Sequence, residues 1–260
     1  MRELLSKVAG KCRRTLADRL HRRMLPLGSS GPIISFSFDD APRTAFKTAG
    51  CMLSSRGAKA TFFVSLGLLG AETEVGTVAS PDDLRRAVTE GHELGCHTFD
   101  HLDAWQTSTG TFMESVARNR QALDRILPGV TLPVFAYPKS GARFALKRPL
   151  EKRFLCCRGG GQVANVGLAD LNLLKACFLD RRTGVDATFV KRLIDHTVST
   201  RGWLILAAHD VTANPSPYGC TPELFEDVVD YATRSRALIL PVAAACRHLM
   251  DGAVTARFPD

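Results

Sequence analysis

The sequence predicts an α/β fold in which about seven β-α units build one barrel-like, mainly parallel sheet. Short apolar runs alternate with helix-like stretches from residue 33 onward. The chain has 260 residues, of which 45% are hydrophobic and 23% are charged, and these are globular proportions. Several apolar runs end in Asp, His, Tyr or Lys, and α/β barrels carry such clusters at the carboxyl ends of their strands.

The first 25 residues are predicted to form a basic amphipathic helix. Apolar residues recur there at spacings of three and four, and eight Lys or Arg stand against two acids, a net charge of +6. Residues 26–32 then break the pattern, so that 1–31 would be a helix with its linker. The helix would pack on the neighbouring domain or lie on anionic lipid, with an acidic polymer as a third partner.

The predicted strands span residues 33–38, 60–65, 92–97, 134–137, 171–178, 204–208 and 237–242. Helix-start signals stand at Ser80-Pro81, at Thr111 with Glu114, and at Thr221-Pro222. We expect one domain over residues 32–250 and a C-terminal tail over 251–260.

Composition excludes several classes of protein. No apolar run approaches the ~18 residues of a membrane span. The first 31 residues carry most of the chain's net charge of +8, so we expect no nucleic-acid partner. The N-terminus lacks the apolar core of a signal peptide, and the eight cysteines include no C-x-x-C. We therefore expect a cytoplasmic protein with reduced thiols, held at most peripherally on the inner membrane surface through residues 2–25; its oligomeric state stays open.

His97 and His101 are candidate metal ligands. A spacing of four places both imidazoles on one side of a helical turn, although H-x-x-x-H alone is a weak signal. A carboxylate from another strand end would complete a site with open coordination positions. Asp39 or Asp40 would supply it, and Ala41-Pro42 favours an exit of the chain there, which both carboxylates need to reach one site.

The adjacency of Asp39 and Asp40 suits two different roles, one as a metal ligand and one as a base. A glycosidase would instead need two carboxyl groups ~5–10 Å apart across a sugar. His209 follows the apolar run 204–208. It is either a hydrogen-bonded histidine at a strand end or a general acid, since histidine titrates near neutrality.

Four segments together resemble the motifs of the NodB-type polysaccharide deacetylases, carbohydrate esterase family 4. Residues 37–40 (S-F-D-D) resemble the family's T-F-D-D motif, and residues 97–101 match H-[ST]-x-x-H. Residues 135–138 resemble the F-A-Y-P form of the third motif, and residues 206–210 resemble the final L-x-x-H-D segment. The motifs occur in the family's order, and the fold would cover residues 32–250.

The resemblance implies a deformed (β/α) barrel with one divalent ion, most commonly Zn²⁺, with Co²⁺, Ni²⁺ or Mn²⁺ as alternatives. By position, Asp40, His97 and His101 would bind the metal ion. Asp39 would be the general base and His209 the general acid.

The substrate would meet a second set of residues. Leu206 would line the pocket for the acetyl methyl group, and the backbone N–H of Lys139, beside Tyr137 and Pro138, would stabilise the oxyanion. Trp105 would stack on a sugar ring or pack on the barrel rim.

The sequence departs from the family pattern at three positions. Ala41 replaces the usual glycine, and Lys139 replaces an aromatic residue. Ala136 stands where many members carry an arginine that orients the base, so the partner of Asp39 is not identified, and Lys175 and Arg181 are the candidates. Lys139 is either solvated or meets an anionic group of the substrate.

The expected activity is a metal-dependent hydrolysis of N-acetyl groups, or less commonly O-acetyl groups. The substrate would be a sugar, an oligosaccharide or a glycan precursor. One alternative is a hydrolase of a non-sugar amide or imide on the same scaffold. Another is a non-catalytic relative that binds glycan or membrane.

Overall fold

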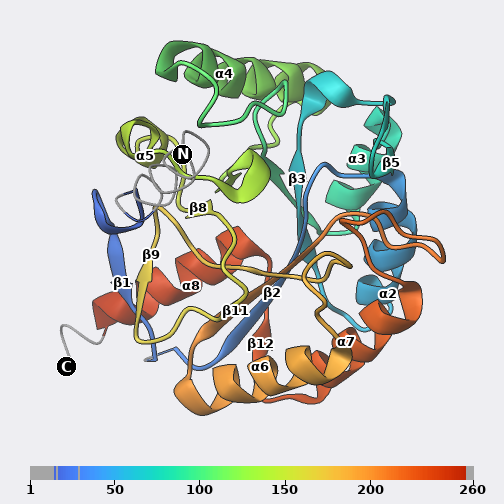
Figure 1. Cartoon of the computed structure of the whole chain (residues 1–260), viewed down its shortest axis with the longest axis vertical. Coiled ribbons are helices and arrows are strands. Elements are labelled where there is room, and N and C mark those ends of the chain that lie inside the picture. Colours follow the sequence, from blue (N-terminus) through green and yellow to red (C-terminus); the bar gives the residue numbers. More distant parts are fainter. Residues whose placement is uncertain (1–14, 16, 29, 256–260) are drawn as a thin grey trace, which may run out of the picture.

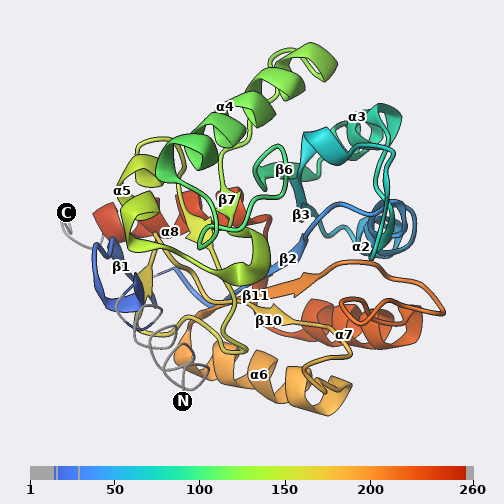
Figure 2. The ribbon, with the colours of Figure 1, turned by 45° about the horizontal axis from the view of Figure 1, so that its top comes forward.

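Seven parallel strands form the centre of the molecule in the order β10-β11-β2-β3-β6-β7-β8 (Figures 1 and 2). They are β2 (Ile33–Phe38), β3 (Ala60–Val64), β6 (Glu93–Cys96), β7 (Phe135–Ala136), β8 (Cys157–Arg158), β10 (Cys177–Phe178) and β11 (Trp203–Ala208). A short strand, β12 (Leu238–Ile239), pairs with the start of β2. The computed structural model describes residues 15, 17–28 and 30–255, and it confirms the α/β barrel prediction.

Strands β2 and β11 are the longest of the sheet and lie side by side. All six residues of each are buried, as in parallel sheets that are covered on both faces. Their register runs from Ile33 opposite Trp203 to Phe38 opposite Ala208. The next residues, Asp39 and His209, therefore leave their strands at the same edge, and the Asp39 N–H donates to the Ala208 carbonyl.

An irregular segment closes the ring between the two edge strands of the sheet. Arg158 of β8 forms a parallel bridge with Leu174, and the chain then reaches β10, which pairs with β11. The strand predicted over residues 171–178 is thus wrong for most of its length, because only Cys177–Phe178 forms regular pairs. Strand β8 was not predicted.

Helices surround the strands (Figure 2). They are α2 (Cys51–Ser54), α3 (Pro81–Thr89), α4 (Thr109–Ile126), α5 (Phe144–Glu151), α6 (Ala187–Thr200), α7 (Pro222–Arg234) and α8 (Val242–Thr255). Ser80 and Thr221 cap α3 and α7 as predicted. Helix α4 begins earlier than predicted, because Ser108 and not Thr111 is its N-cap residue. No described helix is both long and apolar enough to cross a bilayer.

The N-terminal helix prediction is wrong at its end. Residues 17–19 are helical, but β1 (Met24–Pro26) is a strand that pairs antiparallel with β9 (Leu168–Asp170). The body of the protein captures this segment, since the Arg23 N–H donates to Asp170. Residues 1–14 and 16 lie outside the described residues. Helix α8 ends at Thr255, beyond the expected start of the C-terminal tail at residue 251. The expected boundaries of the domain, 32–250, stay a prediction.

Candidate metal centre and active-site cleft

A cleft of about 620 Å³ lies at the carboxyl ends of the strands. Its lining residues come from loops that follow different strands, as expected at this face of a barrel. They are Asp39, Asp40, Leu68, Thr73, Glu74, Val75, His97, His101, Lys139, Ser140, Phe178, Arg182, His209 and Tyr218.

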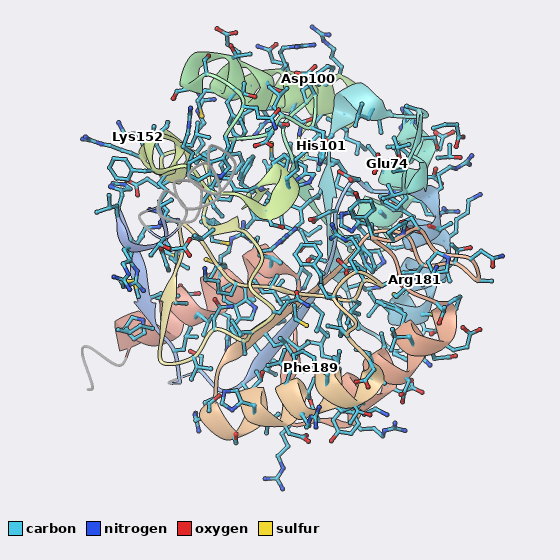
Figure 3. The ribbon with its side chains drawn as sticks, viewed as in Figure 1. Glu74, Asp100, His101, Lys152, Arg181 and Phe189 are labelled. Atoms are coloured by element: carbon cyan, nitrogen blue, oxygen red, sulfur yellow. The ribbon has the colours of Figure 1, made fainter. Side chains whose placement is uncertain are left out.

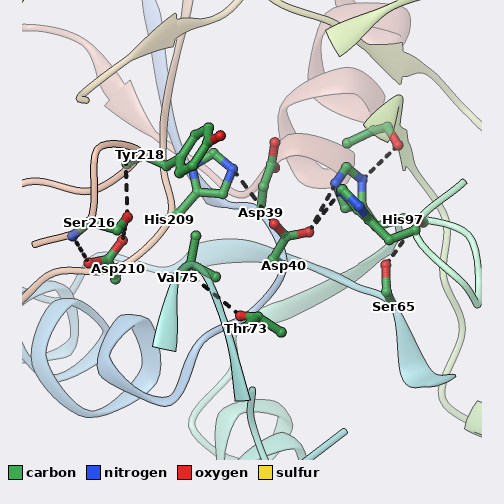
Figure 4. Close-up of polar contacts among 12 residues, drawn as sticks. Asp39, Asp40, Ser65, Thr73, Val75, His97, His209, Asp210, Ser216 and Tyr218 are labelled. Atoms are coloured by element: carbon green, nitrogen blue, oxygen red, sulfur yellow. Dashed lines mark hydrogen bonds and ion pairs between the residues drawn. The ribbon is translucent and has the colours of Figure 1, made fainter. Parts of the chain in front are cut away.

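Asp40, His97 and His101 converge in this cleft, and Figure 4 shows the side chains of Asp40 and His97 facing each other. The His101 Nε2 lies 3.1 Å from the Asp40 Oδ1, and the His97 Nε2 lies 3.5 Å from the same oxygen. One ligand atom of each residue lies within 4.8 Å of the others, so all three can hold one metal ion. The structure therefore brings together the three ligands that the sequence predicts.

The protonation pattern of these groups fits a cation. The His97 Nδ1 lies 2.8 Å from the Ala136 carbonyl, which only accepts, so Nδ1 carries the proton and Nε2 offers a lone pair. Burial lowers the pKa of His97 to about 3 and also lowers that of His101. The Asp40 Oδ1 is buried and accepts no hydrogen bond from any described residue. The ligand atoms of these three residues therefore face one another with lone pairs and no proton between them, which is the arrangement that a divalent ion requires.

Left-handed backbone conformations occur at two of the candidate metal ligands, Asp40 and His101. Asp40 and Ala41 have φ of 59° and 50°, so the chain leaves β2 at the predicted place. Ala41 thus adopts a conformation in which glycine would be unstrained, consistent with the family's glycine at this position. His101 has φ of 52°, and Ser115 of α4 holds its loop by accepting from the Phe99 N–H at 3.0 Å.

Asp39 forms a buried ion pair with Arg158 of β8. The Arg158 NH2 donates to Asp39 Oδ1, and the two residues are 0% and 3% exposed. Burial alone would raise the pKa of Asp39, but the charge of Arg158 and its hydrogen bond outweigh burial, so that the pKa is lowered. The Arg158 guanidinium also lies 4.9 Å from the centre of the Phe63 ring and 5.3 Å from that of Phe178.

Arg158 is the functional residue that sequence reasoning missed. The two candidates for this role are wrong: Lys175 pairs with Asp18 at 3.6 Å, and Arg181 donates to the Pro215 carbonyl. The arginine comes from β8, one strand further along the sheet than the expected position at Ala136 of β7. The sequence did carry a signal for a strand end at this position: Arg158 follows the apolar residues 154–157 and precedes three glycines.

His209 also lines the cleft, beside the candidate metal ligand Asp40. Its Nδ1 lies 3.1 Å from the Tyr218 carbonyl, so Nδ1 carries a proton, and its Nε2 lies 3.9 Å from the Asp40 Oδ2. The loop that supplies this carbonyl is held by Asp210, which accepts from the Ser216 N–H at 2.7 Å and from its hydroxyl at 2.6 Å. His209 thus presents Nε2 to the cleft in a fixed orientation.

The predicted substrate-binding residues divide into two groups. Lys139 lines the cleft, whereas Tyr137, Pro138, Leu206 and Trp105 are not among its lining residues. Leu206 points to the opposite face of β11 from Ile205 and Ala207, and it packs in the cluster that holds Val190 of α6 and Phe225 of α7. The Tyr137 hydroxyl donates to the Asn172 carbonyl, and Trp105 packs against Gly141.

Comparison with known proteins agrees with this geometry. The model of the family described as polysaccharide deacetylase matches residues 28–148. A chitin deacetylase of Colletotrichum lindemuthianum is 30% identical over 118 residues, which cover 43% of this chain and 46% of that protein. A peptidoglycan-N-acetylglucosamine deacetylase of Listeria monocytogenes is 29% identical over 101 residues, 38% of this chain and 20% of that protein. The chain thus spans less than half the length of these relatives.

Solved structures share the fold over most of the chain. The Colletotrichum lindemuthianum chitin deacetylase superposes with a TM-score of 0.60 at 18% identity, over 85% of this chain and 89% of that one. A family 4 acetyl xylan esterase from Clostridium thermocellum, solved with a cobalt ion, gives a TM-score of 0.58 at 21% identity, over 81% of this chain and 88% of that one.

Proposed function

We propose that this chain, which is similar to the polysaccharide deacetylase family over residues 28–148, is a member of that family, carbohydrate esterase family 4, and acts as a metal-dependent carbohydrate deacetylase. The proposed substrate is a sugar, an oligosaccharide or a glycan precursor. It carries an N-acetyl group or, as the second candidate, an O-acetyl group. The observation that carries the proposal is the convergence of Asp40, His97 and His101 beside the buried pair of Asp39 and Arg158.

Asp40, His97 and His101 would hold one divalent ion, with Zn²⁺ as the first candidate. When bound, such an ion lowers the pKa of a water molecule and polarises a carbonyl group. In this proposal the reaction takes place in the 620 Å³ cleft, whose volume is within the range of sites that bind small ligands.

Asp39 is the general base in this proposal. Its lowered pKa keeps the carboxylate ionised and ready to accept a proton from the attacking water. Arg158 fixes the orientation of the carboxylate and is itself buried, so it acts through Asp39 and not on the substrate.

His209 is the general acid in this proposal. Its Nε2 faces the cleft and, once protonated, gives its proton to the leaving amine or alkoxide. The backbone N–H of Lys139, at the edge of the same cleft, donates to the oxygen on which negative charge develops.

The test combines metal content with release of acetate. The purified protein, without a histidine tag, is expected to contain about one divalent ion per chain. We expect it to release acetate from an acetylated chitooligosaccharide or xylan, and a His97→Ala/His101→Ala variant should lose both properties. Metal binding with turnover of simple amides or imides only would favour the non-sugar hydrolase. Absence of metal in the wild-type protein after incubation with zinc would exclude the proposed reaction.

We also propose that the protein works on the cytoplasmic side of an anionic membrane. Residues 1–25 carry a net charge of +6. Three apolar side chains are exposed near the place where this segment pairs with β9: Leu20, Met24 and Leu168. The full chain should sediment with vesicles that contain anionic lipid, and a chain lacking residues 1–14 should not. Equal binding of both chains, or none, would contradict this proposal.

A further inference from the structure

We infer that the sugar substrate carries an anionic group, a carboxylate or a phosphate, which binds between Lys139 and Arg182 on one side of the active-site cleft. This inference rests on the proposed function and adds a substrate class to it. Both side chains line the cleft, and they are about half exposed, at 58% for Lys139 and 49% for Arg182.

The order of the strands places the two cations on one arc of the rim. Lys139 follows β7 and Arg182 follows β10, the strands that flank β8 and the closing segment of the barrel. Gly160, after β8, connects them: a Cβ there would lie 3.3 Å from the Cβ of Ser140 and 3.6 Å from the Phe178 ring. The wall between the two cations is therefore narrow and carries no charged side chain among the cleft-lining residues.

Arg182 is held in place before any substrate arrives. Its NH2 donates at 2.7 Å to Asp180, whose side chain is fully buried, and its guanidinium lies 4.1 Å from the centre of the Tyr218 ring. Asp180 also accepts from the Thr183 N–H at 2.9 Å, so its charge is shared with the backbone. A pre-oriented arginine binds planar anions with a small loss of side-chain entropy.

Lys139 projects from a strained turn. Lys139 and Ser140 both have positive φ, 57° and 56°, which directs the lysine to the mouth of the cleft. The Lys139 Nζ lies 3.8 Å from the Asp103 carboxylate, which is longer than a hydrogen bond, so this pairing does not occupy the N–H donors that a substrate anion would need.

The opposite arc repels an anion. Glu74, which is labelled in Figure 3, lies on the turn between β4 (Glu72–Thr73) and β5 (Gly76–Thr77), the two strands that follow β3. It is exposed and lines the same cleft. Asp39 and Asp40 form the floor between the two arcs. The charges of the rim therefore orient a sugar whose anionic substituent lies toward β7 and β10, while Phe178 and Tyr218 offer aromatic faces to the ring.

The experiment measures binding of three matched methyl glycosides of 2-acetamido-2-deoxyglucose to the metal-loaded protein by calorimetry. One is neutral, one carries a 6-phosphate, and one carries a 6-carboxylate. We expect a charged sugar to bind about tenfold more tightly than the neutral one at low salt, with the preference falling as salt is added. The tighter of the two charged sugars identifies the type of anion.

Variants test whether Lys139 and Arg182 cause the tighter binding of the charged sugars. In Lys139→Met/Arg182→Gln the charged and neutral sugars should bind equally. Arg181→Gln is the matched control, because Arg181 neighbours Arg182 but is not among the cleft-lining residues, and it should keep the preference. Equal or absent binding of all three sugars by the wild type, or a preference that survives the double variant, would overturn the inference. Charge-selective binding without acetate release would instead remove the proposed function and leave the anion site standing.

Discussion

Two buried ion pairs stabilise opposite parts of this molecule, and their surroundings differ. Arg158–Asp39 lies at the carboxyl ends of the strands, and Lys147–Asp170 lies where the N-terminal segment meets β9. Both cations are 0% exposed at the side chain. A buried pair of this kind is costly to break, wherever it lies, because one partner would remain as an uncompensated charge.

The environment of each carboxylate separates the two pairs. Asp170 accepts from the backbone N–H groups of Arg23 and Asn172, and Lys147 also donates to the Leu20 carbonyl at 3.0 Å. Protein groups thus surround the Asp170 pair, and it is not part of the cleft. Asp39 instead lines the cleft beside His97 and His209. In this protein, a buried ion pair therefore indicates a candidate catalytic residue only where its carboxylate also faces a cavity and further titratable groups.

The variant Asp39→Asn is expected to show the largest difference between the two ion pairs. The amide cannot accept a proton from water, so kcat should fall by about 10³-fold. Metal content should stay near that of the wild type, because Asp39 is not one of the three ligands. Mass spectrometry and acetate release measure the two properties. Near wild-type turnover would show that Asp39 is not the base.

Lys147→Met tests the other pair and should act on stability instead of turnover. Asp170 would lose its buried cation and keep only Arg22, whose Nε lies 4.0 Å away, and this loss is expected to lower the free energy of unfolding by about 3–5 kcal/mol. Urea denaturation measures this loss. At a temperature where the variant is folded, kcat/KM should match the wild type, and a large fall in kcat would place this pair in the catalytic machinery.

Arg158→Met should reduce kcat by about 10- to 100-fold, because the base loses its orientation. Arg158 lowers the pKa of Asp39, so its removal raises that pKa. Since turnover requires the ionised carboxylate, the acid limb of the pH profile should move to higher pH. An arginine with a purely structural role would leave the pH profile in place, and Arg158→Lys should restore part of the activity.

His92 offers a comparison with a buried histidine, whose Nε2 lies 3.8 Å from a carboxylate oxygen of Glu90. It accepts from the Ala60 N–H at 3.1 Å, and burial lowers its pKa from 6.5 to about 4. The unfolded chain therefore binds a proton that the folded chain does not, and stability falls as pH drops from 6.5 toward 4. Between pH 7.5 and pH 5 this costs about 2 kcal/mol. His92→Gln should show a correspondingly smaller pH dependence in thermal denaturation, and an unchanged dependence would contradict the assignment.

The smallest effect is expected from removal of residues 1–14. The described contacts of the N-terminal segment with Lys147 and Asp170 begin at Leu20, so the free energy of unfolding should change by less than about 0.5 kcal/mol. Removal of residues 1–28 should destabilise the protein much more, because it deletes β1 and the Leu20 carbonyl. Chemical denaturation of both truncated chains tests this, and equal stabilities would show that the docking of β1 contributes little.

Sequence reasoning predicted the residues of long or repeated patterns. The six-residue apolar run of β2 and its Asp39-Asp40 end were visible, and so was the H-x-x-x-H spacing of His97 and His101. Strands of only two residues, such as β8, are too short for an alternation of apolar and polar residues to emerge. Arg158 was missed for this reason. The Leu206 prediction failed because positions 205 and 207, not 206, face the barrel interior.

The pairing of β2 has a consequence for the synthesis of the protein. One edge of this central strand pairs with residues 60–62, and the other pairs with residues 203–208, which are made about 170 positions later. A growing chain therefore carries an apolar strand with one open edge until most of the protein has left the ribosome. We expect chains that stop before β11 to aggregate or to be degraded, so the cell requires nearly complete translation before this barrel can close.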